Sequence, residues 1–202
     1  IYQSMNLIND ENPDVIVVFG ADHVYRMDAS QMVAAHLEHG AGVTVAGIRV
    51  PRKEAYQFGV IKTDRDHRIK DFIEKPKTTE PMPDDPQRFL ASMGIYVFTA
   101  RFLFEQLCLD ATRPGSAHDF GHNIIPSVIR THRVFAFPFR DENRKRDAYW
   151  RDVGTLDAYF EANMDLIAVQ PELNLYDRAW PIRTFQPQLP PPKFVHDTAD
   201  RR

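Results

Sequence analysis

Two valine-rich runs of apolar residues constrain the fold of this chain more than any other feature. Residues 15–19 read Val-Ile-Val-Val-Phe, and residues 43–50 are almost as apolar. Such runs are typical of strands that are covered on both faces, as in a parallel sheet. The helical pattern of residues 28–39 separates them and ends at Gly40. This strand–helix–strand unit predicts an α/β fold with a mixed, mainly parallel sheet flanked by helices.

The same alternation continues along the chain. Residues 60–64 and 68–73 are predicted to form a hairpin-like pair of strands. Further strands are predicted at residues 89–98 and 134–139, and helices at residues 100–109, 124–129 and 156–168. The residues expected to pack the last of these helices are Tyr159, Phe160, Met164 and Leu166.

The composition argues against several classes of protein. The chain has 202 residues, of which 43% are hydrophobic, enough for one sizeable core. Its formal net charge of −3 gives no electrostatic case for binding nucleic acid or an anionic membrane. No apolar run approaches the ~20 residues that span a bilayer, and the start of the chain does not read as a signal peptide. The single cysteine, Cys108, cannot form an internal disulfide, which favours a cytoplasmic setting.

Two acids stand where ligands bind in open α/β sheets. Asp22 comes just after the first apolar run, and such sheets bind ligands past the carboxyl ends of their strands. Asp152 lies on a short turn between two aromatic residues and a helical pattern, so we expect it to be firmly held. Other interpretations stay open: Asp22 can be a helix cap, and Asp152 can cap a helix or pair with Arg151.

A cation next to an acid adds to this pattern. Glu74 and Lys75 end the second strand of the hairpin pair, directly before Pro76, which restricts the backbone of Lys75. A lysine fixed in this way suits a phosphate monoester, although a surface Glu–Lys pair is an equal alternative. Mg²⁺ is typically held by one or two carboxylates together with substrate phosphates. With Asp22 and Asp152, Lys75 therefore predicts a site for phosphoryl or nucleotidyl transfer, where catalysis depends on positioning and charge.

Three further features bear on this site. Ser92 and Gly94 are small residues before a strand, so they allow a ligand to approach the backbone, or the strands to pack closely. His118, Asp119 and His122 suggest a metal site, but the entry to a helix is the preferred interpretation. No glycine-rich loop of the kind that cradles a nucleotide triphosphate is present in the sequence.

Seven short motifs are spread over almost the whole chain. They are Gly20-Ala-Asp-His-Val-Tyr-Arg-Met-Asp28, Phe58-Gly-Val60, Phe72-Ile-Glu-Lys-Pro76, Ala91-Ser-Met-Gly-Ile-Tyr-Val-Phe98, His118-Asp-Phe-Gly121, Tyr149-Trp-Arg-Asp-Val-Gly-Thr155 and Trp180-Pro-Ile-Arg-Thr184. Together they resemble the bacterial ADP-glucose pyrophosphorylase (glucose-1-phosphate adenylyltransferase) family. Each motif alone is shared with other sugar nucleotidyltransferases, whereas the combination is specific.

The resemblance implies a fold, a reaction and a set of site residues. The fold is a Rossmann-like (GT-A-like) nucleotidyltransferase fold. The reaction joins ATP and glucose 1-phosphate to give ADP-glucose and diphosphate, for glycogen biosynthesis. By resemblance, Asp22 and Asp152 hold Mg²⁺ and, with Lys75, form the catalytic set. The positions that match those binding glucose 1-phosphate are Gly59, Glu74, Lys75 and Ser92.

The resemblance also implies a domain plan. Residues 1–179 match part of the catalytic domain, and residues 180–202 match a linker toward a carboxyl-terminal left-handed β-helix domain. In the family, a glycine-rich nucleotide loop comes before the position of Ile1. We therefore expect a fragment that is inactive by itself, cut from a cytoplasmic, allosteric protein that is a homotetramer at full length.

Three alternatives remain. The first keeps the chemistry but uses UTP, dTTP or GTP with a sugar 1-phosphate. The second is a non-catalytic regulatory subunit of the same family, and the presence of Asp22, Lys75 and Asp152 argues against it. The third is a glycosyltransferase with an Asp-x-Asp metal motif, which is disfavoured because no such motif follows residues 15–19.

Overall fold

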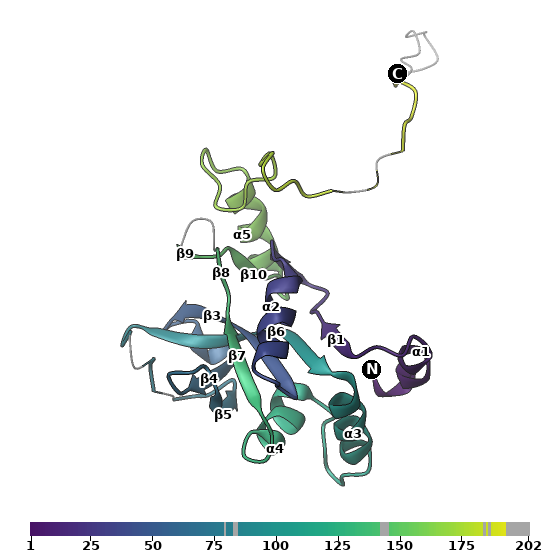
Figure 1. Cartoon of the computed structure of the whole chain (residues 1–202). Helices are drawn as coiled ribbons and strands as arrows, with labels where there is room; N and C mark the ends of the chain where they lie inside the picture. The colour runs from purple at the N-terminus through teal and green to yellow at the C-terminus, as the bar shows by residue number, and fades with distance from the viewer. Residues whose placement is uncertain (79, 83–84, 142–145, 184, 186, 193–202) are drawn as a thin grey trace.

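A long central strand, β6, organises the molecule. The computed structural model describes residues 1–192 apart from 79, 83–84, 142–145, 184 and 186. The main sheet has the order β5–β4–β6–β3–β7, and β1 pairs with β6 beside this path (Figure 1). Its strands are β1 (Val15–Val18), β3 (Val43–Pro51), β4 (Gly59–Thr63), β5 (Ile69–Glu74), β6 (Arg88–Thr99) and β7 (Val134–Pro138).

The directions of these strands confirm one part of the prediction and correct another. The α/β fold with a mixed sheet and the β4–β5 hairpin are confirmed. The expectation of a mainly parallel sheet is wrong for the described strands, because only β3 and β7 pair in parallel. An apolar run indicates that both faces of a strand are buried, but it does not indicate the direction of the strand. A central antiparallel strand can be buried on both faces as well. The first run is not fully covered either, since residues 15–18 in β1 are only half-buried.

The alternation of side chains along β6 divides the core in two. Phe89, Ala91, Met93, Ile95 and Val97 belong to the cluster on one face. The opposite cluster receives Leu90, Tyr96 and Phe98. Helix α2 packs on the first face, with Met32 fully buried there, and α3 and α4 pack on the second. This two-sided burial explains why apolar residues predominate on both faces of β3 and β6.

The helices follow the predicted pattern closely. They are η1 (Tyr2–Ser4), α1 (Met5–Asp10), α2 (Ala29–Glu38), η2 (Ala55–Gln57), α3 (Ala100–Ala111), η3 (Phe120–Ile124), α4 (Ile125–Val128) and α5 (Leu156–Leu166). One expected helix, at residues 124–129, begins instead with the π-helical turn η3. None of the described helices is both long enough and apolar enough to cross a membrane.

A two-stranded ribbon is separate from the main sheet and leads into α5. It pairs β2 (His23–Tyr25) with β10 (Trp150–Asp152), and α5 follows within a few residues (Figure 1). A second short pair joins β8 (Arg140–Asp141) to β9 (Arg146–Asp147).

Helix α5 corrects one prediction about packing. Tyr159, Phe160 and Met164 are 58%, 64% and 46% exposed, whereas Ala162 is buried. After α5, the described residues form no further helix or strand. The linker expected at residues 180–202 stays a prediction, and its residues 184, 186 and 193–202 lie outside the described part of the chain.

Candidate active site

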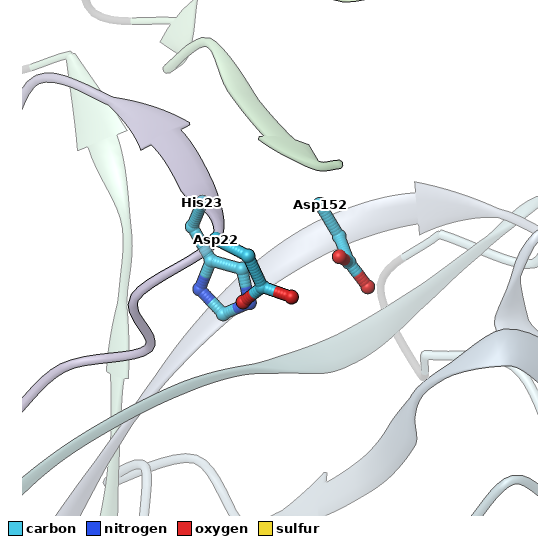
Figure 2. A group of neighbouring side chains, drawn as sticks. All are labelled: Asp22, His23 and Asp152. Atoms are coloured by element: carbon cyan, nitrogen blue, oxygen red, sulfur yellow. The ribbon is translucent and has the colours of Figure 1, made fainter. Parts of the chain in front are cut away.

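The β2–β10 ribbon brings together the two acids that the sequence singled out. Asp152 is the register partner of His23, and the backbone N–H of Val153 donates to the carbonyl of Asp22 at 3.1 Å. One ligand atom from each of Asp22, His23 and Asp152 lies within 4.8 Å of the others. Figure 2 shows the three side chains turned toward one shared space. The local sequence pattern did not predict this ribbon. The pairing of its two strands nevertheless brings the two acids close together.

The alternative roles of these acids do not hold in the structure. The cap of α2 is Asp28, which accepts from the N–H of Ser30, and not Asp22. The cap of α5 is Thr155, which accepts from the N–H of Ala158.

Asp152 is also not paired with its neighbour Arg151. The guanidinium of Arg151 bonds Asp165 at 3.0 Å instead. Oδ1 of Asp152 accepts the N–H of Gly154 at 2.9 Å, which fixes the carboxylate on its turn. Asp152 is thus held in place by its own backbone turn, and its second oxygen has no protein donor among the described residues.

His23 is a member of the site that sequence reasoning missed. Its Nε2 lies 3.6 Å from Oδ1 of Asp22, and its Nδ1 is buried without a described partner. The imidazole packs edge-on against Trp150, with ring centroids 5.2 Å apart. A Cβ on Gly20 would come within 2.5 Å of the ring, so glycine leaves room for it. The only signal in the sequence was its position next to Asp22.

The donor set of this cluster fits a hard divalent cation. Asp22 and Asp152 offer carboxylate oxygens, which Mg²⁺ prefers. The side chain of Asp22 is 62% exposed, which leaves space for water and substrate oxygens around an ion. His23 offers an imidazole that softer ions accept more readily, so the two acids are the expected Mg²⁺ ligands.

A cavity of about 310 Å³ adjoins these acids and contains the other predicted residues. Gly59, Glu74, Lys75 and Ser92 all line it, together with Asp152. Asp119, Phe120, Gly121 and Trp150 also line it, although none of them was predicted to bind substrate. The structure therefore brings every predicted substrate-binding residue to one cavity.

The cavity lies where one edge of β6 loses its neighbours. On that edge, β4 pairs with Leu90 and Ala91, and β1 pairs with residues 96–99. Between these two contacts, Gly94 takes a left-handed φ of +67°. A register shift between Val45 and Gly47 of the opposite neighbour, β3, lies at the same level. Irregularities of this kind bend a strand and redirect its side chains, which opens the sheet here.

Glu74 occupies a space that two glycines leave free. A Cβ on Gly59 or on Gly121 would come within 2.7 Å of its Oε2. Gly59 thus supports the site by making room rather than by a side chain. Burial raises the pKa of Glu74, and the nearby carboxylate of Asp119 raises it further, while Lys75 and His122 act in the opposite direction.

Lys75 is an exposed cation on an unusual backbone. Its φ is +44°, and its N–H donates to the carbonyl of Phe58 at 3.1 Å. A left-handed conformation is costly for lysine, so the surrounding chain must enforce it. The alternative of a surface ion pair with Glu74 is not observed, since no salt bridge of Lys75 occurs in the described part of the chain. The amino group is therefore available to an anion.

The metal-site interpretation of residues 118–122 is not supported. Among the described residues, the one cluster that could hold a metal ion is Asp22, His23 and Asp152. Asp119 instead caps η3 by accepting from the N–H of His122 at 2.7 Å, as expected for the entry to a helix.

A larger hollow of about 620 Å³ is lined by none of the predicted site residues. Arg26, Tyr149 and the segment around Asp177 line it. Arg26 bonds Asp177 at 3.0 Å and the carbonyl of Asn174 at 2.8 Å, which ties this segment to the ribbon. Size alone does not make it the reactive site, because Asp22, Asp152 and Lys75 do not line it.

Comparison with known proteins identifies the family of this chain. Residues 1–169 match the model of the Nucleotidyl transferase family. A glucose-1-phosphate adenylyltransferase of Rhodopirellula baltica is 61% identical over 201 residues, which cover 100% of this chain and 45% of that protein. Proteins of the same name from Methylococcus capsulatus and Methylobacillus flagellatus are 52% and 54% identical, over 100% of this chain and 48% of each.

These matches cover this chain fully but not the relatives. The chain spans about half the length of the curated relatives it matches. The family match, by contrast, covers most of the chain and includes the ribbon, the acids and the cavity. The chain belongs to the nucleotidyl transferase family.

Proposed function

We propose that this chain is the catalytic part of a glucose-1-phosphate adenylyltransferase, which converts ATP and glucose 1-phosphate to ADP-glucose and diphosphate. The observation that carries the proposal is the meeting of Asp22 and Asp152 beside the cavity that holds Glu74 and Lys75. The names of relatives at 61% and 54% identity support the choice of substrates.

In this proposal Asp22 and Asp152 hold Mg²⁺, which when bound offsets the negative charge of the phosphates. Lys75 binds the phosphate of glucose 1-phosphate as a compact point charge. Glu74, beside the space left by Gly59 and Gly121, accepts hydrogen bonds from sugar hydroxyls. Ser92, which is buried in the cavity wall, contributes a hydroxyl to sugar binding.

The chemistry asks little of the protein beyond placement. An oxygen of the sugar phosphate attacks the α-phosphorus of ATP, the bond to the leaving diphosphate breaks, and no proton need be removed from the nucleophile. That agrees with a site built of anchored charges rather than of an activated nucleophile. The proposal extends to Mg²⁺ dependence, a role in glycogen biosynthesis, a cytoplasmic location, allosteric control and a homotetramer of the full-length protein.

The test is a panel of nucleotides with the full-length protein that contains this chain. Diphosphate release is measured with ATP, UTP, dTTP or GTP and glucose 1-phosphate, with and without Mg²⁺. We expect release with ATP and Mg²⁺ and at least about tenfold less with the other nucleotides. Preference for another nucleotide would favour the alternative sugar-1-phosphate nucleotidyltransferase. No release with any nucleotide would favour a regulatory subunit.

A further inference from the structure

Asp110 is a carboxylate in a place that two physical rules disfavour. It lies in the last turn of α3 and is only 5% exposed. The C-terminal end of a helix carries partial negative charge, which repels an acid. Burial penalises a charged group further unless it is hydrogen-bonded. A carboxylate that is both buried and at a helix C-terminus needs specific hydrogen-bond partners. Those partners identify the segment that the carboxylate fixes in place.

The partners of Asp110 all belong to the loop that follows α3. The hydroxyl of Ser116 donates to its Oδ1 at 2.7 Å, and Nδ1 of His118 lies 2.8 Å from its Oδ2. The N–H of His118 in turn donates to the hydroxyl of Ser116 at 3.0 Å. Desolvation alone would raise the pKa of Asp110, but the bonds from His118 and Ser116 bring it below its ordinary value. The carboxylate therefore fastens the far end of the loop to the helix.

That far end leads directly into the wall of the cavity. His118 has a left-handed φ of +55°, and the next residue, Asp119, caps η3. Asp119, Phe120 and Gly121 line the cavity, whereas His118 does not. If the bond to Asp110 were lost, the strained backbone of His118 could relax and turn the chain at Asp119. The contact between Asp110 and His118 therefore lies outside the cavity but can fix the position of Asp119–Gly121 in its wall.

We propose that Asp110 and His118 are positioning residues that hold Asp119–Gly121 against the cavity by fixing the left-handed turn at His118. The inference rests on the proposed function in one respect, namely that glucose 1-phosphate occupies the cavity. Its physical content is independent of the substrate: the side chain of His118, 58% exposed, acts through the backbone of Asp119.

The test compares three variants of the full-length protein. His118→Ala removes the donor and keeps a Cβ at the strained position. His118→Asn restores a donor near the place of Nδ1 and tolerates the left-handed region. His67→Ala is the matched control, because His67 also has a positive φ, +61°, and is exposed in the turn between β4 and β5. No side-chain hydrogen bond of His67 is found among the described residues.

Two measurements are made on each variant. The first is the KM for glucose 1-phosphate beside kcat and the KM for ATP. We expect His118→Ala to raise the KM for glucose 1-phosphate about tenfold, with the other constants changed less than about twofold, and His118→Asn to restore most of the loss. His67→Ala should leave all three unchanged. The proposal would be overturned if His118→Ala changed kcat and both KM values by similar factors, or if it left the KM for glucose 1-phosphate unchanged.

The second measurement needs no substrate. The N–H groups of His122 and Asn123 bond Asp119 through its side chain and its carbonyl. We expect their hydrogen exchange to quicken about tenfold in His118→Ala while α3 keeps its protection. Unchanged exchange at residues 120–124 would overturn the positioning role. If the unaltered protein shows no adenylyl transfer, the proposed function fails, and this exchange experiment still decides the inference.

Discussion

The carboxylate of Asp152 could serve a helix, an ion pair or a ligand, and its neighbours decide among these roles. Thr155 already caps α5, and Asp165 already holds Arg151. The turn of Gly154 fixes one oxygen of Asp152 and leaves the other for a ligand. The role of an acid is therefore settled by which groups its neighbours have already satisfied.

Asp152→Asn tests the charge of this residue apart from its geometry. Asparagine keeps an oxygen that can accept the N–H of Gly154, so the turn should survive. We expect kcat of the full-length protein to fall roughly 10²- to 10³-fold, because the change removes charge stabilisation in the transition state. The measurement is kcat at saturating Mg²⁺ and substrates. Asp157→Asn, an acid in the first turn of α5, is the control and should keep its activity. A fall of less than about threefold in Asp152→Asn would remove it from the catalytic set.

Lys75→Ala tests the proposed phosphate contact. A hydrogen bond to a charged group is worth about 1.5–3 kcal/mol, so the KM for glucose 1-phosphate should rise roughly ten- to a hundredfold while kcat changes less. The neighbouring exposed lysine gives the control: Lys77→Ala should leave this KM unchanged, since Lys77 does not line the cavity. Initial rates over a range of glucose 1-phosphate measure both. An unchanged KM in Lys75→Ala would exclude the phosphate contact.

At the scale of elements, His36 joins α2 to the sheet. Its Nδ1 lies 2.9 Å from the hydroxyl of Thr44 in β3, and its Nε2 lies 3.1 Å from that of Thr99 at the end of β6. The imidazole is only 1% exposed. Burial lowers its pKa from the ordinary value of 6.5, so the folded chain holds it neutral.

The sign of the resulting pH dependence follows from this shift. Below pH 6.5, His36 binds a proton in the unfolded chain but stays neutral in the folded chain until the pH reaches its lowered pKa. The stability that neutral His36 contributes is therefore fully present above pH 6.5. It is lost as the pH falls from there toward the lower pKa that His36 has in the folded chain. We expect the free energy of unfolding to drop by up to about 1.4 kcal/mol per pH unit there. Urea unfolding of residues 1–202 between about pH 7.5 and 5.5 measures it. His36→Gln, which does not titrate, should show a flatter profile, and an equally steep one would exclude His36 as the source.

Local sequence pattern predicted the elements that have strong local signals. The apolar run of β3, the helix α2 and the β4–β5 hairpin lie where periodicity placed them. The strand directions and the β2–β10 ribbon were not predictable in this way. Three-residue strands carry almost no pattern, and their pairing joins residues far apart in the chain.

The site shows the same division. Asp22, Glu74, Lys75 and Asp152 were predictable from their positions at strand ends and turns, and the resemblance added Gly59 and Ser92. His23 was not assigned a role, and Asp119 was interpreted only as the entry to a helix, because each becomes part of the site only through tertiary contacts. The sequence could not show that Gly59 and Gly121, from different elements, leave space for one carboxylate.

At the scale of the whole molecule, this chain contains the acids and the cavity but only part of the length of its relatives. The named relatives are about twice as long. A glycine-rich nucleotide loop is not found in the sequence, and none of the cavity-lining residues supplies one. Binding of a triphosphate commonly depends on such backbone donors.

The fragment of residues 1–202 should therefore be inactive by itself. We expect no release of diphosphate above background when the purified fragment receives ATP, glucose 1-phosphate and Mg²⁺. The full-length protein under the same conditions is the control. Activity of the fragment would show that its own residues suffice to bind ATP productively.

Trp150 gives this architecture an optical consequence. Its indole lies between Phe58, near the start of β4, and His23 in the ribbon, with ring centroids 5.3 and 5.2 Å away. Its buried Nε1–H has no described partner. The chain has one other tryptophan, Trp180, which is 39% exposed. Trp150 also lines the cavity. Indole emission depends on the polarity around the ring, so the fluorescence of a Trp180→Phe variant would change when a ligand fills the cavity and displaces water from around Trp150.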